Sequence, residues 1–160
     1  MNRYCFLVIV VLTAIASACM SINARGGGVY PEYYPGPYYP SHYEVADGKS
    51  IRVILPVWFG IDRRVTLIVR GIDTPGISAL LPECEHIAGL KAKSYLQNLL
   101  TFGPMVVQDV EPIVNGYLAS VAVRSGREVV DVASAVVARG HGVWFNGQDL
   151  NQPWSCNVSD

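Results

Sequence analysis

The sequence lacks the features that mark a nucleic-acid-binding or membrane-spanning chain. Its 12 Lys and Arg residues are outnumbered by 13 Asp and Glu residues, whereas binding to phosphates normally needs a basic face. The apolar run from Phe6 to Ile15 has 10 residues, and a helix that crosses a bilayer needs about 20. The four cysteines and three histidines are scattered. These absences argue against a nucleic-acid partner and against a transmembrane helix.

The N-terminal residues have the pattern of an export signal. Arg3 gives a short positive region, the apolar run follows it, and three small residues, 16–18, precede Cys19. We interpret residues 1–18 as a signal peptide. A buried core helix is the alternative, but it would begin at the initiator methionine and end in a glycine- and proline-rich tract.

Cys19 is a candidate lipidation site. Residues 15–19 resemble the cleavage box of bacterial lipoproteins, with Ala16 in place of the usual leucine. Cleavage by an ordinary signal peptidase after Ala18 or Ala24 is the alternative. Lipidation or removal of Cys19 leaves an even number of cysteines in the exported part, as an oxidising compartment favours. We therefore expect a lipid anchor in the bacterial envelope, at the outer membrane or its periplasmic face.

Residues 19–43 form a linker by composition, because Gly, Pro and Tyr dominate from residue 25 onward. Prolines favour an extended polyproline II chain, and such a spacer would reach about 50 Å. A stiff tether is one interpretation. The other is an arm whose aromatic rings dock on a partner. The candidate docking residues are Tyr33, Tyr34, Tyr38 and Tyr39.

Residues 44–160 are predicted to form one domain with the element order β-β-α-β-β-α. Runs of β-branched residues predict the first strands, and a stripe of apolar residues at helical spacing predicts the first helix. Val129, Val132, Ala133 and Val136 would share one face of a second helix that ends at Gly140. The predicted strands are 51–57, 65–70, 105–110 and 117–123, and the predicted helices are 86–100 and 128–138.

Two short motifs resemble those of the thermonuclease-like, or staphylococcal-nuclease-like, domain family. They are Asp47-Gly48-Lys49-Ser50 and Arg70-Gly71-Ile72-Asp73-Thr74-Pro75, where the family usually has Asp-Gly-Asp-Thr and Arg-Gly-Ile-Asp-Thr-Pro-Glu. Weaker matches follow in the expected order at residues 84–93, 115–119, 137–140 and 154–156. The resemblance covers roughly residues 45–156. It implies an α+β fold, a five-stranded OB-fold-type barrel with two to three packed helices.

The resemblance also implies a chemistry whose residues are largely replaced. The family uses Ca²⁺ held by carboxylates, a glutamate that activates water, and two arginines that stabilise charge on the phosphoryl oxygens. At the metal positions Asp73 and Thr74 persist, but Lys49 replaces a carboxylate. The position of the glutamate is Gly76.

Neither arginine of the family is present at its own position. One position is Ile68, and the other is Gly116 or Tyr117, depending on a one-residue choice of alignment. The loss of one transition-state donor costs about 10²–10³ in rate, and the loss of a general base about 10²–10⁴. The resemblance therefore implies a pseudoenzyme without catalytic residues or a metal cofactor, in which we expect Lys49 to pair with Asp73.

An active nuclease with a rearranged site is the alternative. Arg70 lies two residues from the lost arginine position, and Glu85 follows the missing glutamate by nine positions. Because residues two apart share a face of a strand, Arg70 could approach the cleft. In that case the protein would be a secreted, Ca²⁺-dependent enzyme that hydrolyses phosphodiesters.

Cys84 and Cys156 are predicted to form a disulfide that ties the C-terminal tail to the start of the first helix. In the chain-entropy model a closed loop of about 73 residues stabilises a fold by about 4 kcal/mol. A metal site at Cys84 and His86 is the alternative. It lacks a second pair of ligands at a suitable spacing.

Taken together, these patterns predict a non-catalytic envelope protein that acts as a structural or binding module. Envelope proteins are the expected partners, for example in a secretion or conjugation assembly. Binding of nucleic acid or glycan without cleavage is a third hypothesis, which the slightly acidic balance argues against. Nothing in the sequence indicates the oligomeric state.

Overall fold

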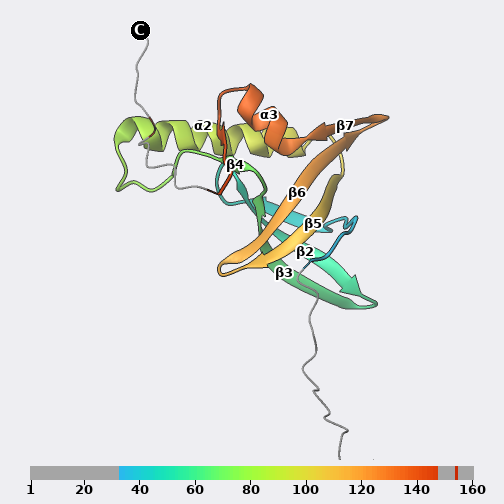
Figure 1. Cartoon of the computed structure of the whole chain (residues 1–160). Coiled ribbons are helices and arrows are strands. Elements are labelled where there is room, and N and C mark those ends of the chain that lie inside the picture. The colour runs from blue at the N-terminus through green and yellow to red at the C-terminus, as the bar shows by residue number, and fades with distance from the viewer. Residues whose placement is uncertain (1–32, 148–153, 155–160) are drawn as a thin grey trace, which may run out of the picture. The chain divides into compact units, whose positions relative to one another are not determined.

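The computed structural model describes residues 33–147 and Trp154. The predicted signal peptide, Cys19 and Cys156 lie outside these described residues. Figure 1 shows the described elements in chain order: β1 His42–Val45, β2 Ser50–Trp58, β3 Ile61–Val69, β4 Ile72–Asp73, α2 Glu83–Leu100, β5 Met105–Ile113, β6 Gly116–Ser125, β7 Glu128–Asp131, α3 Val132–Ala138 and β8 Val143–Trp144.

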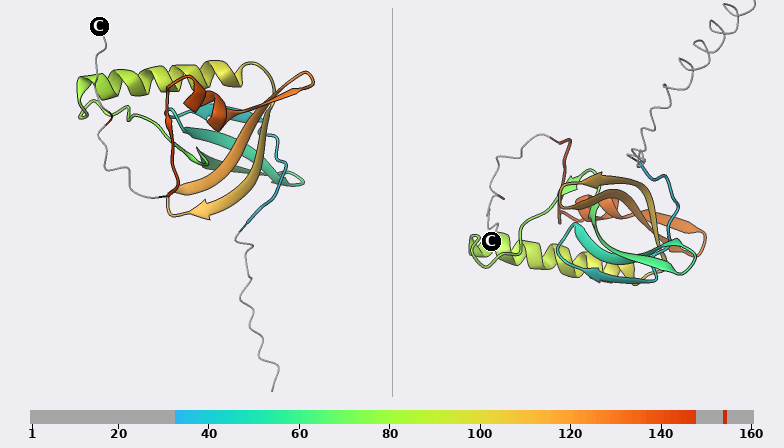
Figure 2. Two further views of the ribbon diagram at one scale, coloured as in Figure 1. Left: turned by 45° about the horizontal axis from the view of Figure 1, so that its top comes forward. Right: turned by 90° about the horizontal axis from the view of Figure 1, so that it is seen from below.

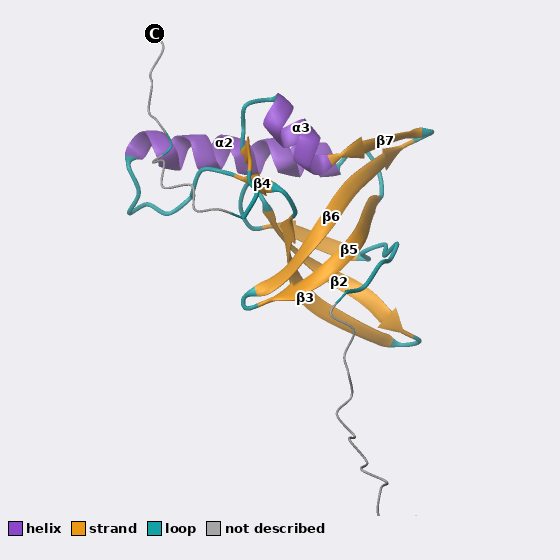
Figure 3. Cartoon of the chain, viewed as in Figure 1, coloured by secondary structure: helices purple, strands orange, loops and turns teal. Residues whose placement is uncertain are grey.

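One six-stranded sheet carries most of the strands. Its order is β1-β2-β3-β6-β5, and β7 also pairs with β6. Strands β3 and β6 run parallel, and the other pairs in this sheet are antiparallel. A small second sheet joins β4 to β8, with Asp73 opposite Val143. Figure 3 shows both helices on one side of the strands.

Local sequence explains the sheet's two central hairpins. In β2, Ile51, Val53 and Leu55 alternate with more exposed residues and are buried, as expected for a strand with one face on the core. The turn to β3 contains Gly60 at a φ of +72°, a left-handed conformation that favours glycine. The buried residues of β6 alternate in the same way: Ala119, Val121 and Val123.

Helix α2 lies along one end of the curved sheet, as the two views in Figure 2 show. Its buried residues are Gly89, Ala92, Leu96, Leu99 and Leu100. Three of them, Leu96, Leu99 and Leu100, join buried valines and leucines of the sheet and of α3 in one core cluster. The prediction of a helix ending at residue 100 is confirmed, although the helix begins three residues earlier than expected.

The prediction of a second helix over residues 128–138 is wrong for its first turn. Residues Glu128–Asp131 form β7, which pairs with β6 through a turn containing Gly126 at a φ of +61°. The helix begins only after Asp131, whose side chain accepts a hydrogen bond from the Ser134 amide at 2.7 Å, a usual helix cap. Val129 is accordingly 58% exposed, and it does not join the buried face formed by Val132, Ala133 and Val136.

The predicted α+β class is confirmed, but the sheet is not closed into the predicted five-stranded barrel. Strands β1 and β5 stand at the two ends of the sheet path and do not pair with each other in the described part of the chain. The segment before β1 contacts β5 instead, through isolated bridges from Tyr34 to Val110 and from Tyr38 to Val107.

The tyrosine-rich segment 33–43, predicted as part of a linker, is hydrogen-bonded to the sheet. The backbones of Tyr34 and Val110 exchange two hydrogen bonds of 2.8 and 2.9 Å, and those of Tyr38 and Val107 do the same. The rings of Tyr34, Tyr38 and Tyr43 pack against the core. Of the four tyrosines predicted to dock on a partner, two therefore pack on the chain's own core.

No helix in the described residues is long and apolar enough to cross a membrane.

Candidate functional site

The two motifs that resemble the nuclease family meet in the folded chain. Lys49 lies just before β2, and Asp73 ends β4. The Lys49 ammonium donates a hydrogen bond to Oδ1 of Asp73 and forms an ion pair with it. The two side chains are 32% and 24% exposed. The contact predicted between Lys49 and Asp73 is therefore present.

Asp47 is committed to the turn that presents Lys49. Its Oδ1 accepts hydrogen bonds from the backbone amides of Lys49, at 2.9 Å, and Ser50, at 2.7 Å. The backbone amide of Ala46 also donates to the Ser50 carbonyl oxygen at 2.8 Å. A carboxylate that accepts two backbone amides stabilises a tight turn. Asp47 thus fixes the direction in which the Lys49 side chain leaves the backbone.

Thr74 is buried behind this pair. It is 6% exposed and is the buried polar residue of the described core. A Cβ atom on Gly48 would lie 2.9 Å from Thr74 Oγ1 and 2.8 Å from the Ala92 Cβ. The glycine therefore lets the turn approach both Thr74 and helix α2 closely.

Gly76 stands where the resemblance implies a glutamate, and Glu85 comes close to it from helix α2. The Gly76 amide donates to Oε1 of Glu85 at 3.3 Å. The same oxygen lies 3.5 Å from the point that a Cβ on Gly76 would occupy. The fold thus places a carboxylate beside Gly76, as the alternative of a rearranged site requires. One oxygen of that carboxylate is engaged by the backbone.

Arg70, the other residue of the rearranged-site hypothesis, points its guanidinium at strand β5. Its Nη1 donates to Oε2 of Glu111 at 3.0 Å, and its Nη2 donates to the Asp109 carbonyl oxygen at 2.8 Å. These contacts hold Arg70 across the sheet. The structure therefore brings Glu85 to the candidate site and ties Arg70 to β5.

The two positions at which the resemblance implies arginines are occupied by uncharged residues of the sheet. Ile68 lies in β3, opposite Leu118 of β6. Gly116 has a φ of +149°, and a Cβ there would lie 2.6 Å from the Thr66 carbonyl oxygen. Tyr117 packs against the core. An arginine at residue 116 would displace the neighbouring strand.

Sequence reasoning missed a polar cluster around Asp109. This residue has a φ of +54° at the irregularity in the β5–β6 register between Gln108 and Glu111. Its Oδ1 accepts a hydrogen bond from the Tyr33 hydroxyl, and this bond to Asp109 raises the pKa of the Tyr33 phenol. The cluster joins Arg70 to the N-terminal segment. The contact between Tyr33 and Asp109 joins residues 76 positions apart, so it leaves no local signal in the sequence.

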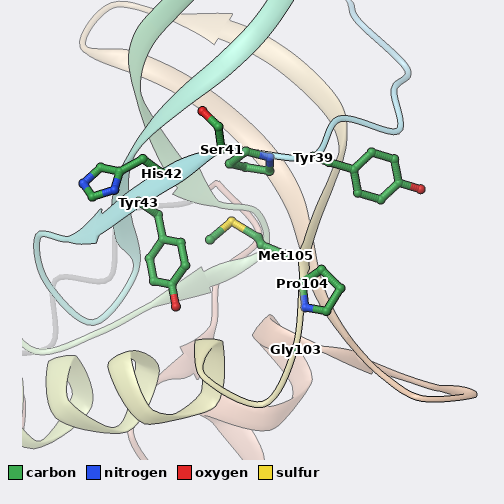
Figure 4. A pocket seen from close by; sticks show the side chains of 8 residues that line it. Tyr39, Ser41, His42, Tyr43, Gly103, Pro104 and Met105 are labelled. Carbon is green, nitrogen blue, oxygen red and sulfur yellow. The ribbon is translucent and has the colours of Figure 1, made fainter.

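A pocket of about 440 Å³ opens where the N-terminal segment meets the loop between α2 and β5. Figure 4 shows Tyr43 and Met105 side by side in it and Tyr39 turned away from them. The Tyr43 hydroxyl donates to the Leu100 carbonyl oxygen at 3.1 Å. The lining residues are Tyr39, Pro40, Ser41, His42, Tyr43, Gly103, Pro104 and Met105. His42 is the imidazole among them, and no carboxylate or Lys joins it, so the lining offers little acid–base chemistry.

The other candidate metal ligands either lie apart from one another or are already bonded to other residues. Cys84 is disulfide-bonded, which argues against the alternative of a Cys84–His86 metal site. Its predicted partner, Cys156, lies outside the described residues, so the pairing stays a prediction. Among the described residues, no three His, Cys, Asp or Glu side chains are grouped so that they could hold a metal ion.

His141 follows helix α3 and contacts helix α2, and it does not contact the Lys49–Asp73 pair in the described residues. Its ring centroid lies 4.8 Å from that of Tyr95 on α2. Burial, followed by the charges of Arg139 and Lys91, lowers the pKa of His141. Both effects favour a neutral ring, as expected for a packing histidine.

Neither a protein-family model nor a curated protein matches this chain. The resemblance to thermonuclease-like domains therefore stays a prediction that depends on the motifs themselves.

Proposed function

We propose that this chain carries a thermonuclease-like domain without nuclease activity, which acts as a binding or structural module in the bacterial envelope. The observation that carries the proposal is the ion pair between Lys49 and Asp73. An ammonium group bound to Asp73 takes up the carboxylate that a divalent cation would need, and its charge repels such an ion. Ca²⁺ takes about six to eight oxygen ligands, and this set of donors does not fit it.

The other positions support the same proposal. Gly76 has no side chain to accept a proton, and Ile68, Gly116 and Tyr117 carry no charge. Arg70 is hydrogen-bonded to Asp109 and Glu111 at 2.8 and 3.0 Å. Stabilisation of charge on a phosphoryl group needs donors already aimed at it. Arg70 is the donor among these residues, and its guanidinium is bonded to strand β5.

We infer that the fold is an OB-type barrel, a small barrel that is often partly open. The parallel pair of β3 and β6 supports this inference, because it brings the C-terminal hairpin back beside the N-terminal one. The bridges from Tyr34 and Tyr38 to β5 also support it, since this segment leads directly into β1. In such folds the sheet face and its loops serve as a binding surface without catalysis.

A Ca²⁺-dependent nuclease is the second candidate, which the position of Glu85 beside Gly76 favours. A cleavage assay separates the two. The full chain, incubated with single-stranded DNA and Ca²⁺, is expected to cleave no faster than its Asp73→Ala variant. Cleavage that is lost in both Asp73→Ala and Glu85→Gln would overturn the proposal and support the rearranged site.

Ca²⁺ is expected to leave the melting temperature of the wild-type chain unchanged and to raise that of Lys49→Asp. The substitution replaces the ammonium by a second carboxylate beside Asp73, and ligand binding to the folded state stabilises it by about 2.7 kcal/mol at a hundredfold excess over Kd. Lys49→Met is the matched control, because it removes the charge without adding a ligand. A strong rise in the wild type would contradict the metal-free site.

The envelope location is proposed from the signal-peptide and lipobox patterns alone. Membrane fractionation of the native chain and of Cys19→Ser tests it. We expect the variant to leave the membrane fraction if Cys19 carries the lipid. Proteins that co-purify with the wild type from native membranes would identify the partner class.

A further inference from the structure

We propose that the β2–β3 hairpin dips its apolar tip into the surface of an anionic bilayer. This hairpin extends beyond the rest of the sheet. Strand β1 pairs with β2 only as far as Ile54, and β6 pairs with β3 only at Leu67, Ile68 and Val69. Residues 55–66 therefore form a two-stranded ribbon, which Figure 1 shows projecting from the sheet.

The end of this ribbon is apolar and exposed. Phe59 is 95% exposed, Ile61 49% and Val57 48%. The turn Phe59-Gly60 holds these three side chains at one end of the ribbon. Exposed apolar groups gathered at one point mark a contact surface. Leu55 and Val65, at the base of the ribbon, belong to the core or pack against it, whereas the three exposed side chains at the tip lie outside it.

Charged residues stand directly behind the tip. Arg63 and Arg64 are exposed on β3, with Asp62 beside them, so this part of the ribbon is net positive. Apolar groups followed by arginines fit an anionic lipid surface, because affinity for such a surface rises with buried apolar area and with attraction to the headgroups. The long arginine side chains can reach phosphates while the tip lies among the acyl chains.

The edges of the ribbon argue against a protein strand as the occupant. Pro56 has no amide hydrogen to donate on β2, and the free edge of β3 carries Asp62, Arg63 and Arg64. Proline and charges on an edge strand prevent another strand from pairing with it. A bilayer surface needs no such pairing. The inference does not depend on the proposed loss of catalysis, since the hairpin shares no residue with the Lys49–Asp73 pair.

The test places a nitroxide at the tip of the full chain in vesicles. The variant Phe59→p-acetylphenylalanine accepts the label and leaves every cysteine in place. Matched controls carry the same label at Leu80 and Val114, which are 97% and 99% exposed and lie outside the hairpin. Vesicles contain equal parts of phosphatidylcholine and phosphatidylglycerol, or phosphatidylcholine alone. The ratio of the nitroxide's accessibility to oxygen to its accessibility to a water-soluble nickel complex reports how deeply the label lies in the bilayer.

We expect the oxygen-to-nickel accessibility ratio at residue 59 to be several times higher than at residues 80 and 114, and only in vesicles that contain phosphatidylglycerol. Arg63→Gln with Arg64→Gln should lower the partition coefficient for these vesicles about thirtyfold. Equal ratios at all three positions would overturn the proposal, as would protection of residue 59 in lipid-free solution, which would indicate a protein contact. Equal insertion into phosphatidylcholine alone would overturn the role of the arginines. A nuclease assay on the same samples reports separately on the proposed function.

Discussion

Reduction of the disulfide at Cys84 is expected to lower the free energy of unfolding by about 4 kcal/mol. Cys84 lies in the first turn of α2 and is disulfide-bonded. If the partner is Cys156, as predicted, the bond closes a loop of about 73 residues, and constraint of the unfolded chain accounts for the effect. A small domain has a total stability of about 5–15 kcal/mol, so this loss is a large part of it.

Chemical denaturation with and without a reductant measures this change, and single substitutions assign the pair. Cys84→Ser and Cys156→Ser should each lose the same free energy, and reduction should then have no further effect. Cys5→Ser and Cys19→Ser are the controls and should leave the stability of the domain unchanged. A loss in Cys84→Ser without a matching loss in Cys156→Ser would show that Cys84 has another partner.

Elements with a strong local signal were predictable from the sequence, whereas those decided by pairing with another strand were not. The run of β-branched residues between Ile51 and Val57 predicts a strand without any knowledge of its neighbours. The apolar spacing from Val129 to Val136 fits a helix throughout, yet pairing with β6 makes residues Glu128–Asp131 a strand. The helix begins where Asp131 can cap it.

The N-terminal tyrosines show the same limit. Their proline-rich context favours an extended chain, which is the conformation needed to lie along an open strand edge. Composition alone does not reveal that this edge is β5 of the same chain. The hydrogen bonds from Tyr34 and Tyr38 to β5 depend on residues about 70 positions away, and an extended segment can equally be a spacer.

The part of the candidate site formed by the two sequence motifs was predictable. The contact between Lys49 and Asp73 follows from two strand-end motifs that the fold brings together. The direction of Arg70 did not follow, because its partners Asp109 and Glu111 flank an irregularity in the β5–β6 register. The approach of Glu85 to Gly76 depends on how α2 packs, which spacing along the chain does not determine.

Gly89→Ala is expected to destabilise the fold by about 2 kcal/mol, although helix propensity alone predicts the opposite. In a helix interior, alanine is more favourable than glycine by about 1 kcal/mol. In this fold, however, a Cβ on Gly89 would overlap the Gly76 carbonyl oxygen and would lie 2.7 Å from the Gly76 carbonyl carbon and 2.9 Å from the Pro75 oxygen. These are backbone atoms that cannot rotate away, and overpacking typically costs about 1–3 kcal/mol.

The same contact sets the geometry of the candidate site, because Gly76 is held against α2 by its hydrogen bond to Glu85. A displaced helix would carry Glu85 away from Gly76. Ser94→Ala is the matched control, since Ser94 is exposed on the same helix and its substitution should stabilise by a few tenths of a kcal/mol at most. Urea denaturation of both variants tests the packing. If Gly89→Ala stabilised the chain as Ser94→Ala does, α2 would not press on the segment at Gly76, and the carboxylate of Glu85 would have to be placed elsewhere.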